Sequence, residues 1–189
     1  PHAVVCDIDT LTTLPPREYR AGLGELAKYH FLVHERLDEL PMDLRVARCV
    51  EIKAEVVVDD ERESGRRAVL NYGHTLAHAL ETAGRYDLRH GEAVAVGLVY
   101  AAEVAHRLGR IDADDVAEHR RVVAGYDLPA TVPAGLDTDA VLELFAREKK
   151  ALDGVTFVLD GPDGVEPVSG IERSVLVDAL DAVRPRERS

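Results

Sequence analysis

Aromatic residues and cysteines are scarce in this 189-residue chain, which has no tryptophan, three phenylalanines and two cysteines. Cys6 and Cys49 are far apart in the sequence and lack CxxC spacing. We therefore expect both to be small core residues, and not a disulfide or a zinc knuckle.

Long apolar runs are also missing. No segment approaches the roughly 18 consecutive apolar residues that a membrane span needs. The N-terminus has no charged start followed by an apolar core, the pattern of a secretory signal. The sequence predicts a cytoplasmic protein without a membrane partner.

Positive charge is in deficit: 23 Lys and Arg stand against 35 Asp and Glu, a net charge of −12. No stripe of Lys and Arg interrupts this acidity, which argues against a nucleic-acid partner. With 46% hydrophobic and 31% charged residues, the composition is that of an ordinary globular protein. Alanine, leucine and valine are abundant, which suits packed helices.

Apolar spacing predicts a mainly α, multi-helical fold. The expected helices run from Pro16 into the thirties, 44–58, 71–83 (ended by Gly84), 90–108, from Asp112 or Asp114 to about 124, 138 to about 152, and 172–183. The second is rich in β-branched residues and is expected to be buried. Residues 3–6 read as a short buried strand, 59–69 as a charged connection, and the segments around 155–160 and 164–170 as a hairpin.

These elements predict three parts: a strand and turn in residues 1–15, a helical domain in 16–184, and a charged tail in 185–189. A chain seldom begins on a buried strand without neighbours to pair with it. We therefore expect the sequence to be the C-terminal part of something larger.

Histidines gather in NYGHTLAHALE and RHGEAVAVG, two segments that are otherwise apolar and small. His74, His78 and Glu81 fall at i, i+4 and i+7, so they share one helix face. His90 follows one helix and a turn later, close enough for its helix to return alongside. Crowded imidazoles need a metal, a carboxylate or an anionic ligand. Glu25, an acid between Gly24 and Leu26, is the best candidate for a further metal ligand.

Several cations accompany this set. Lys28 lies on the face of Glu25, where an ordinary i, i+3 ion pair is the plainer interpretation. Lys53 lies among apolar neighbours, Arg67 and Asn71 precede the His-bearing helix, and Lys149 ends another helix. These residues could form a pocket for a polyanion such as a phosphorylated sugar acid, with His78 moving protons.

Three segments together resemble the C-terminal domain of 3-dehydroquinate synthase, a sugar phosphate cyclase of the shikimate pathway: AGLGELAKY, EIKAEVVVDDERESGRRAVLNYGHTLAHALE and RHGEAVAVGLVYAAE. The resemblance runs from Pro1 to about Val183. It implies that Glu25, His74 and His90 bind zinc, or cobalt in its place. It also places Lys28, Lys53, Arg67, Asn71, His78 and Lys149 around the substrate, and implies a homodimer, since the family commonly dimerises.

The resemblance implies a phosphate-eliminating lyase that converts 3-deoxy-arabino-heptulosonate 7-phosphate to 3-dehydroquinate. NAD oxidises a substrate hydroxyl, phosphate leaves, hydride returns, and an aldol step closes the ring. Lys53 and Arg67 would hold the carboxylate and phosphate groups.

This sequence departs from the family at three points. Ala77 replaces a glycine, and Glu148 replaces an aspartate before the lysine pair. We do not expect these 189 residues to include the family's NAD-binding α/β domain. The chain is therefore expected to be inactive by itself.

Three alternatives stay open. One is another cyclase, which makes an amino-dehydroquinate, a valiolone or a deoxy-inosose; the retained Lys28, Lys53, Arg67, Asn71 and His78 favour a substrate with a carboxylate. A second is a metal-dependent alcohol dehydrogenase similar to glycerol dehydrogenase. The third is a non-catalytic helical fragment.

Overall fold

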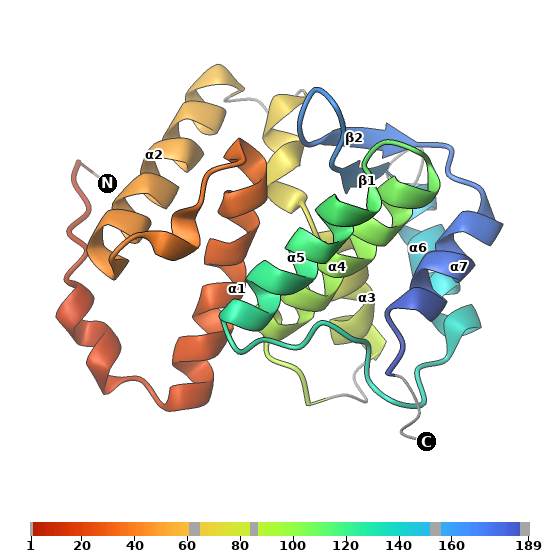
Figure 1. Cartoon of the computed structure of the whole chain (residues 1–189), viewed down its shortest axis with the longest axis horizontal. Coiled ribbons are helices and arrows are strands. Elements are labelled where there is room, and N and C mark those ends of the chain that lie inside the picture. Colours follow the sequence, from red (N-terminus) through yellow and green to blue (C-terminus); the bar gives the residue numbers. More distant parts are fainter. Residues whose placement is uncertain (1, 61–64, 84–86, 152–155, 186–189) are drawn as a thin grey trace.

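The chain is built around one buried helix, α4 (His90–Arg107), which contacts four other helices and a strand (Figure 1). The computed structural model describes residues 2–60, 65–83, 87–151 and 156–185, without the side chains of 148–151. The other elements in these ranges are η1 (Ile8–Thr13), α1 (Pro16–Val33), η2 (Leu37–Glu39), α2 (Met42–Asp59), η3 (Arg66–Asn71), α3 (His74–Ala83), α5 (Ala113–Gly125), α6 (Thr138–Ala151), β1 (Thr156–Leu159), β2 (Glu166–Ser169) and α7 (Arg173–Ala182).

Helix α4 forms the core because its side chains from Ala93 to Ala105 are apolar on nearly every side; the one charged residue among them, Glu103, is paired with Arg107 and Arg120. Every residue from Ala93 to Ala105 is buried, and α1, α3, α5, α7 and β1 pack around it. A helix without a polar face is stable in water only when other elements surround it. The prediction of a mainly α fold is confirmed, as is the hairpin near the C-terminus, in which Thr156 pairs with Ser169 and Leu159 with Glu166.

Glycines bring α4 into backbone contact with its neighbours, as expected of Gly91 and Gly97. A Cβ added to Gly24 of α1 would lie 2.6 Å from the carbonyl carbon of Gly91. One added to Gly97 would lie 2.8 Å from the carbonyl carbon of Gly73. Both distances are below any ordinary carbon–carbon contact. No larger residue fits at these two crossings.

The predicted helix ends are largely confirmed. Asp112 caps α5, and its carboxylate accepts hydrogen bonds from the backbone N–H groups of Asp114 and Asp115 at 2.8 and 3.0 Å. Gly109 follows α4 with a φ of +69°, the conformation expected of a residue beyond a C-cap. The predicted stop at Gly84 lies outside the described residues.

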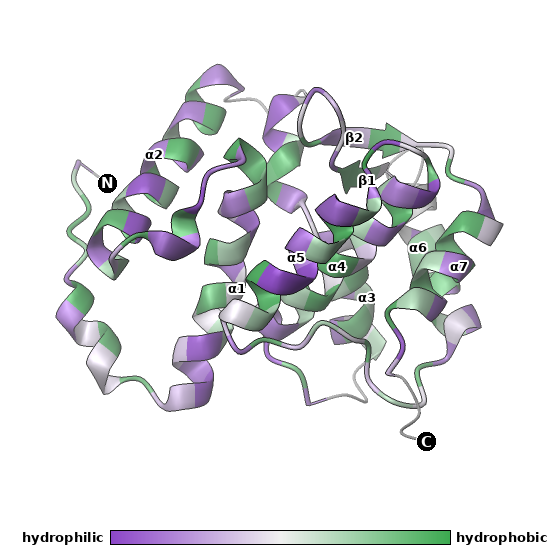
Figure 2. Cartoon of the chain, in the orientation of Figure 1, coloured by the Kyte–Doolittle hydropathy of each residue, from purple (hydrophilic) through white to green (hydrophobic). Residues whose placement is uncertain are grey.

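Two expectations about the N-terminal half are wrong. Residues 2–7 form no strand and are exposed, because β1 and β2 pair only with each other and no other described strand is available to pair with this segment. Helix α2 is not buried: it lies at the outer edge of the molecule, where polar and apolar turns alternate (Figures 1 and 2). Only Cys49, Ile52 and Val56 on α2 are buried. The β-branched residues of α2 suit a buried helix, but no other described element covers the outer face of α2.

The segment before α3 also differs from expectation. The end of the predicted connection, residues 66–69, continues through Leu70 and Asn71 as the 3₁₀ helix η3, so Asn71 is the last residue of η3 and not the start of α3. Gly73, with a φ of +79°, redirects the chain so that α3 starts at His74. Of the two cysteines, Cys49 is buried as expected, whereas Cys6 is exposed.

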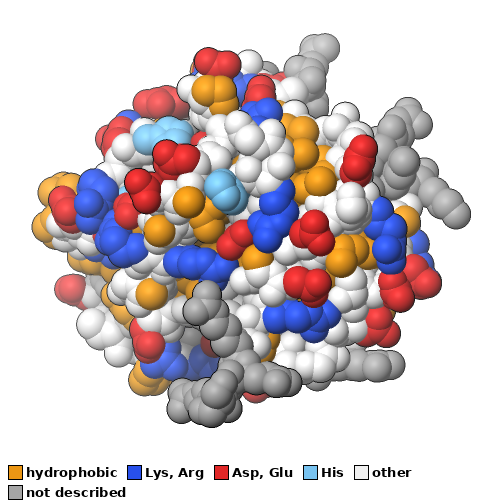
Figure 3. All heavy atoms as spheres, turned by 45° about the vertical axis from the view of Figure 1, so that its right-hand side comes forward, with side chains coloured by type: hydrophobic (Ala, Val, Ile, Leu, Met, Phe, Trp, Pro, Cys, Tyr) orange, Lys and Arg blue, Asp and Glu red, His pale blue; other side chains and the backbone are white. Residues whose placement is uncertain are grey.

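The surface carries charges of both signs. Acidic and basic side chains are interspersed over the face shown in Figure 3. Among the described residues, no helix is long and apolar enough to cross a membrane.

Candidate metal centre

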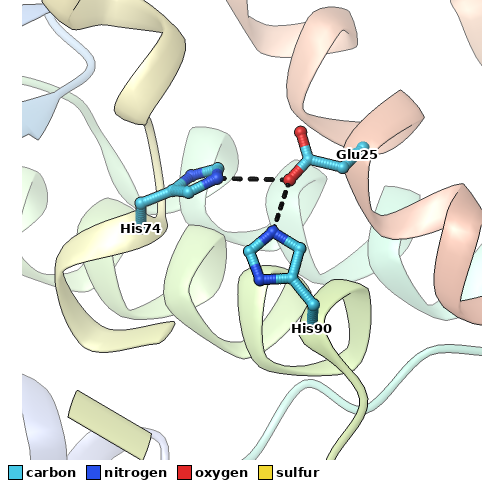
Figure 4. Close-up of side chains that lie close together, drawn as sticks. All are labelled: Glu25, His74 and His90. Atoms are coloured by element: carbon cyan, nitrogen blue, oxygen red, sulfur yellow. Dashed lines mark hydrogen bonds and ion pairs between the residues drawn. The ribbon is translucent and has the colours of Figure 1, made fainter. Parts of the chain in front are cut away.

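Three side chains from three helices point at one place (Figure 4). Oε1 of Glu25 on α1 lies 3.2 Å from Nε2 of His74 on α3 and 3.0 Å from Nε2 of His90 on α4. All three donor atoms lie within 4.8 Å of one another. The structure thus brings together the three residues predicted from the sequence as metal ligands.

Close backbone contacts explain this convergence. Glu25 follows Gly24 and His90 precedes Gly91, the two glycines at which α1 and α4 touch. His74 follows Gly73, whose carbonyl lies against Gly97 of α4. Each donor is therefore next to a glycine at a helix crossing, where short side chains can reach across.

The outward nitrogens of both imidazoles also have partners. Nδ1 of His74 lies 3.1 Å from the backbone carbonyl oxygen of Tyr72, and Nδ1 of His90 lies 3.0 Å from Oε1 of Glu81. Each ring thus has an oxygen acceptor at both nitrogens. Both rings are therefore held from two sides, by an oxygen of Glu25 at Nε2 and by a second oxygen at Nδ1.

The charge of Glu25 is held in place by Lys28, which is almost fully buried. Nζ of Lys28 lies 2.7 Å from Oε2 of Glu25 and 2.7 Å from the carbonyl oxygen of Leu70. Burial alone would raise the pKa of Glu25, but the contact with His74 and the positive charge of Lys28 outweigh it. The pKa of Glu25 therefore lies well below its usual range, and the carboxylate stays ionised at neutral pH.

This donor set fits a divalent metal ion. Two imidazole nitrogens and one carboxylate oxygen make a catalytic zinc set that leaves a position open for substrate or water. The distances of 3.0 and 3.2 Å are close to the roughly 3.3 Å that separates two ligand atoms on a tetrahedral zinc. Acceptors at both Nδ1 atoms are the outer partners that usually orient metal-binding histidines.

The predicted substrate residues are placed less closely. His78 is exposed on α3, with its ring centroid 5.6 Å from that of His74. Asn71 is exposed at the end of η3, and Arg67 is half-buried near its start. Lys53 is exposed on α2. Lys149 lies on α6, but its side chain is outside the described part of the chain.

Two residues have roles that the sequence pattern did not reveal. Glu92, in the HGE segment, accepts hydrogen bonds from the guanidinium of Arg17 at 3.0 and 2.8 Å and from the N–H of Arg89 at 2.9 Å. It therefore caps α4 and connects it to α1, and it is not one of the three converging donors in the described part of the chain. Glu81 contacts Nδ1 of His90, on the side of the ring away from Glu25; its i+7 spacing from His74 predicted the shared helix face but not this contact.

The chain belongs to the 3-dehydroquinate synthase C-terminal family, whose sequence profile matches residues 22–151. It is 49% identical to a putative aminodehydroquinate synthase of Amycolatopsis mediterranei, over 99% of this chain and 53% of the relative. It is 44% identical to the 3-dehydroquinate synthase of Geobacter metallireducens, over 96% of this chain and 54% of the relative. The chain thus spans about half the length of the curated relatives it matches.

Solved structures show the same fold. A 2-epi-5-epi-valiolone synthase from Streptomyces hygroscopicus, with NAD⁺ and Zn²⁺ bound, matches 94% of this chain and 54% of its own with a TM-score of 0.77 at 22% identity. A 2-deoxy-scyllo-inosose synthase complexed with carbaglucose-6-phosphate, NAD⁺ and Co²⁺ matches 94% of this chain and 54% of its own with a TM-score of 0.75 at 24% identity. The sequence profile and the curated relatives confirm the predicted resemblance to the family, and these structures confirm its fold.

Proposed function

We propose that this chain supplies the metal centre and most substrate contacts of a 3-dehydroquinate synthase. The reaction converts 3-deoxy-arabino-heptulosonate 7-phosphate to 3-dehydroquinate with loss of phosphate. The convergence of Glu25, His74 and His90 carries the proposal. Membership of the family and the 44% identity to a named 3-dehydroquinate synthase support it.

Glu25, His74 and His90 would hold the ion, zinc or cobalt. Bound there, the metal would act as a Lewis acid on a substrate oxygen, while NAD bound in the complete enzyme would exchange hydride with the substrate. Lys28 keeps the Glu25 carboxylate ionised and in place, through its contact at 2.7 Å.

The remaining roles belong to groups near η3 and α3. His78, exposed beside His74, would exchange protons with solvent and substrate. Lys53 and Arg67 would bind the carboxylate and phosphate groups of a phosphorylated sugar acid, with Asn71 and Lys149 nearby. A homodimer in the cytoplasm, without nucleic-acid or membrane partners, completes the proposal.

A second candidate is an aminodehydroquinate synthase, the activity named for the 49% identical relative. It would need the same metal centre and the same cations for carboxylate and phosphate. The two candidates differ in one substrate substituent, an amino group in place of a hydroxyl. The residues named above would bind the carboxylate and phosphate groups that both substrates carry, so product analysis must separate the two candidates.

Calorimetric titration with zinc tests the metal centre. The wild-type chain should bind about one zinc ion, and the double variant His74→Ala, His90→Ala should bind it at least 100-fold more weakly. A matched control is His2→Ala, His106→Ala, which removes two exposed imidazoles outside the centre. Equal zinc affinity in all three proteins would refute the metal centre.

Phosphate release tests the reaction. Supplied with zinc, NAD and substrate, the chain by itself is expected to release no phosphate. The same assay on the chain joined to an NAD-binding α/β domain of a relative should show turnover, and mass spectrometry should identify 3-dehydroquinate. Formation of the amino product from the amino substrate alone would select the second candidate. Steady turnover by the isolated chain would contradict the division of roles.

A further inference from the structure

The carboxylate of Glu81 lies behind His90, on the side of the ring away from Glu25. Its Oε1 is 3.0 Å from Nδ1 of His90, while Nε2 of the same ring is 3.0 Å from Glu25. Both partners are half-exposed, with 35% of the Glu81 side chain and 48% of the His90 side chain accessible. An ordinary exposed ion pair of this kind would contribute little to stability.

The position of Glu81 relates its contact with His90 to the metal centre more than to stability. Glu81 lies two turns after His74 on α3, so the two side chains share a helix face. One helix therefore provides both a candidate ligand and the group that contacts another candidate ligand on α4. Glu81 itself is not among the three converging donors in the described part of the chain.

The two histidines differ in what lies behind them. His74 contacts a neutral backbone carbonyl, that of Tyr72, whose position is set by the chain direction at Gly73. His90 contacts a carboxylate on a side chain. Only the partner of His90 carries a charge, and only that partner can be removed by substitution.

We infer that Glu81 is a positioning residue of the metal centre: its carboxylate accepts a hydrogen bond from the Nδ1–H of His90, which fixes that tautomer and directs the Nε2 lone pair at the ion. This inference rests on the proposed function, because it needs a metal at Glu25, His74 and His90. A carboxylate partner also makes an imidazole a stronger electron donor to a metal. His90 is the first residue of α4 and its ring is half-exposed, so Glu25 and Glu81 are the described contacts that orient it.

Metal titration of three variants tests the inference. Glu81→Ala should weaken zinc and cobalt binding by about 10- to 100-fold, the usual effect of losing such a partner. Glu81→Gln keeps an acceptor oxygen without the charge, so it should recover part of the affinity. Glu143→Ala removes an exposed carboxylate on α6 that is not among the converging donors of the described residues, and should bind like wild type. The urea midpoint of metal-free Glu81→Ala should match that of wild type.

The tautomer provides a readout that a purely structural role would not change. With ¹⁵N-labelled histidine, His90 of the zinc-bound wild type should show a protonated Nδ1 and a metal-bound Nε2. The Glu81→Ala variant should show a mixture of tautomers or loss of the metal-bound signal. Wild-type affinity together with an unchanged His90 signal would overturn the inference but leave the metal centre standing. Absence of metal binding in the wild type would overturn both.

Discussion

Replacing Gly91 by alanine should separate α1 from α4 and damage the metal centre. The added Cβ would lie 2.7 Å from the carbonyl carbon of Ala21, and closer still to its oxygen. Carbon atoms pack at about 3.5–4.0 Å, so the two helices must move apart by about 1 Å. The neighbouring atoms belong to the backbone, so no side chain can turn aside to make room.

The substitution has two opposite effects on the free energy of unfolding: the clash lowers it and the better helix propensity of alanine raises it by less. Overpacking of this kind destabilises a protein by about 1–3 kcal/mol, whereas alanine improves helix propensity over glycine by about 1 kcal/mol. We expect a net loss of about 1–2 kcal/mol in the free energy of unfolding. The effect on metal binding should be larger, because ligand distances tolerate deviations of only about 0.2 Å. His90 is the residue next to the clash, so zinc affinity should fall more than tenfold.

Urea unfolding without metal and calorimetric zinc titration measure the two effects separately. Gly22→Ala is the matched control, since a Cβ on this α1 residue meets nothing within 4 Å. It should stabilise the chain by about 0.5–1 kcal/mol and leave zinc affinity unchanged. If Gly91→Ala unfolds and binds zinc as Gly22→Ala does, the close crossing of α1 and α4 does not hold the donors in place.

Three further substitutions test the packing around the site. Asp112→Ala removes the carboxylate cap of α5 and should lower the free energy of unfolding by about 1 kcal/mol, as urea unfolding will show. Lys28→Met leaves the Glu25 carboxylate and the Leu70 carbonyl without their shared donor and should lower the free energy of unfolding by about 1–3 kcal/mol. The control Lys53→Met, on the exposed face of α2, should change it by less than about 0.5 kcal/mol. Equal effects of the two substitutions would refute the role of the Lys28 contacts. Burial lowers the pKa of His119 from a usual 6.5 to about 4. As the pH falls, the unfolded chain therefore protonates this imidazole before the folded chain does. The stability that the neutral His119 contributes is complete above pH 6.5 and is lost as the pH falls toward 4. That contribution should fall by about 2 kcal/mol between pH 7 and pH 5, and His119→Gln should lose stability less steeply over this interval.

Helices with a strong pattern and a clear cap were predictable from the sequence. The apolar run after His90 and the carboxylate of Asp112 each determine local structure without help from distant residues. Glu25 was predictable for a different reason: an acid between glycine and leucine on an apolar helix needs a partner. The failures lie where structure depends on neighbours. The burial of α2 and the strand at residues 3–6 both required packing partners that composition alone cannot supply.

The outer partners of the histidines show a second limit. The acceptor for His74 is the backbone carbonyl of Tyr72, and any residue at that position has one. Only the fold, through the turn at Gly73, determines where this carbonyl points. Glu81 was visible as a residue on the same helix face as His74. Its contact with His90 depends on how α3 and α4 pack, which spacing within one helix cannot reveal.

Core packing and the metal centre are therefore two aspects of one arrangement. Glu25, His74 and His90 each adjoin a glycine, and at these glycines α1 and the turn before α3 contact the backbone of α4. A bound ion would hold the same three helices together and stabilise the fold. The gain would be about 2.7 kcal/mol when the free ion concentration is a hundred times the dissociation constant. Conversely, substitution of a glycine at one of these helix contacts, even by an apolar residue, should displace the metal-binding side chain next to it. The glycines at these contacts therefore determine where the three candidate ligands lie.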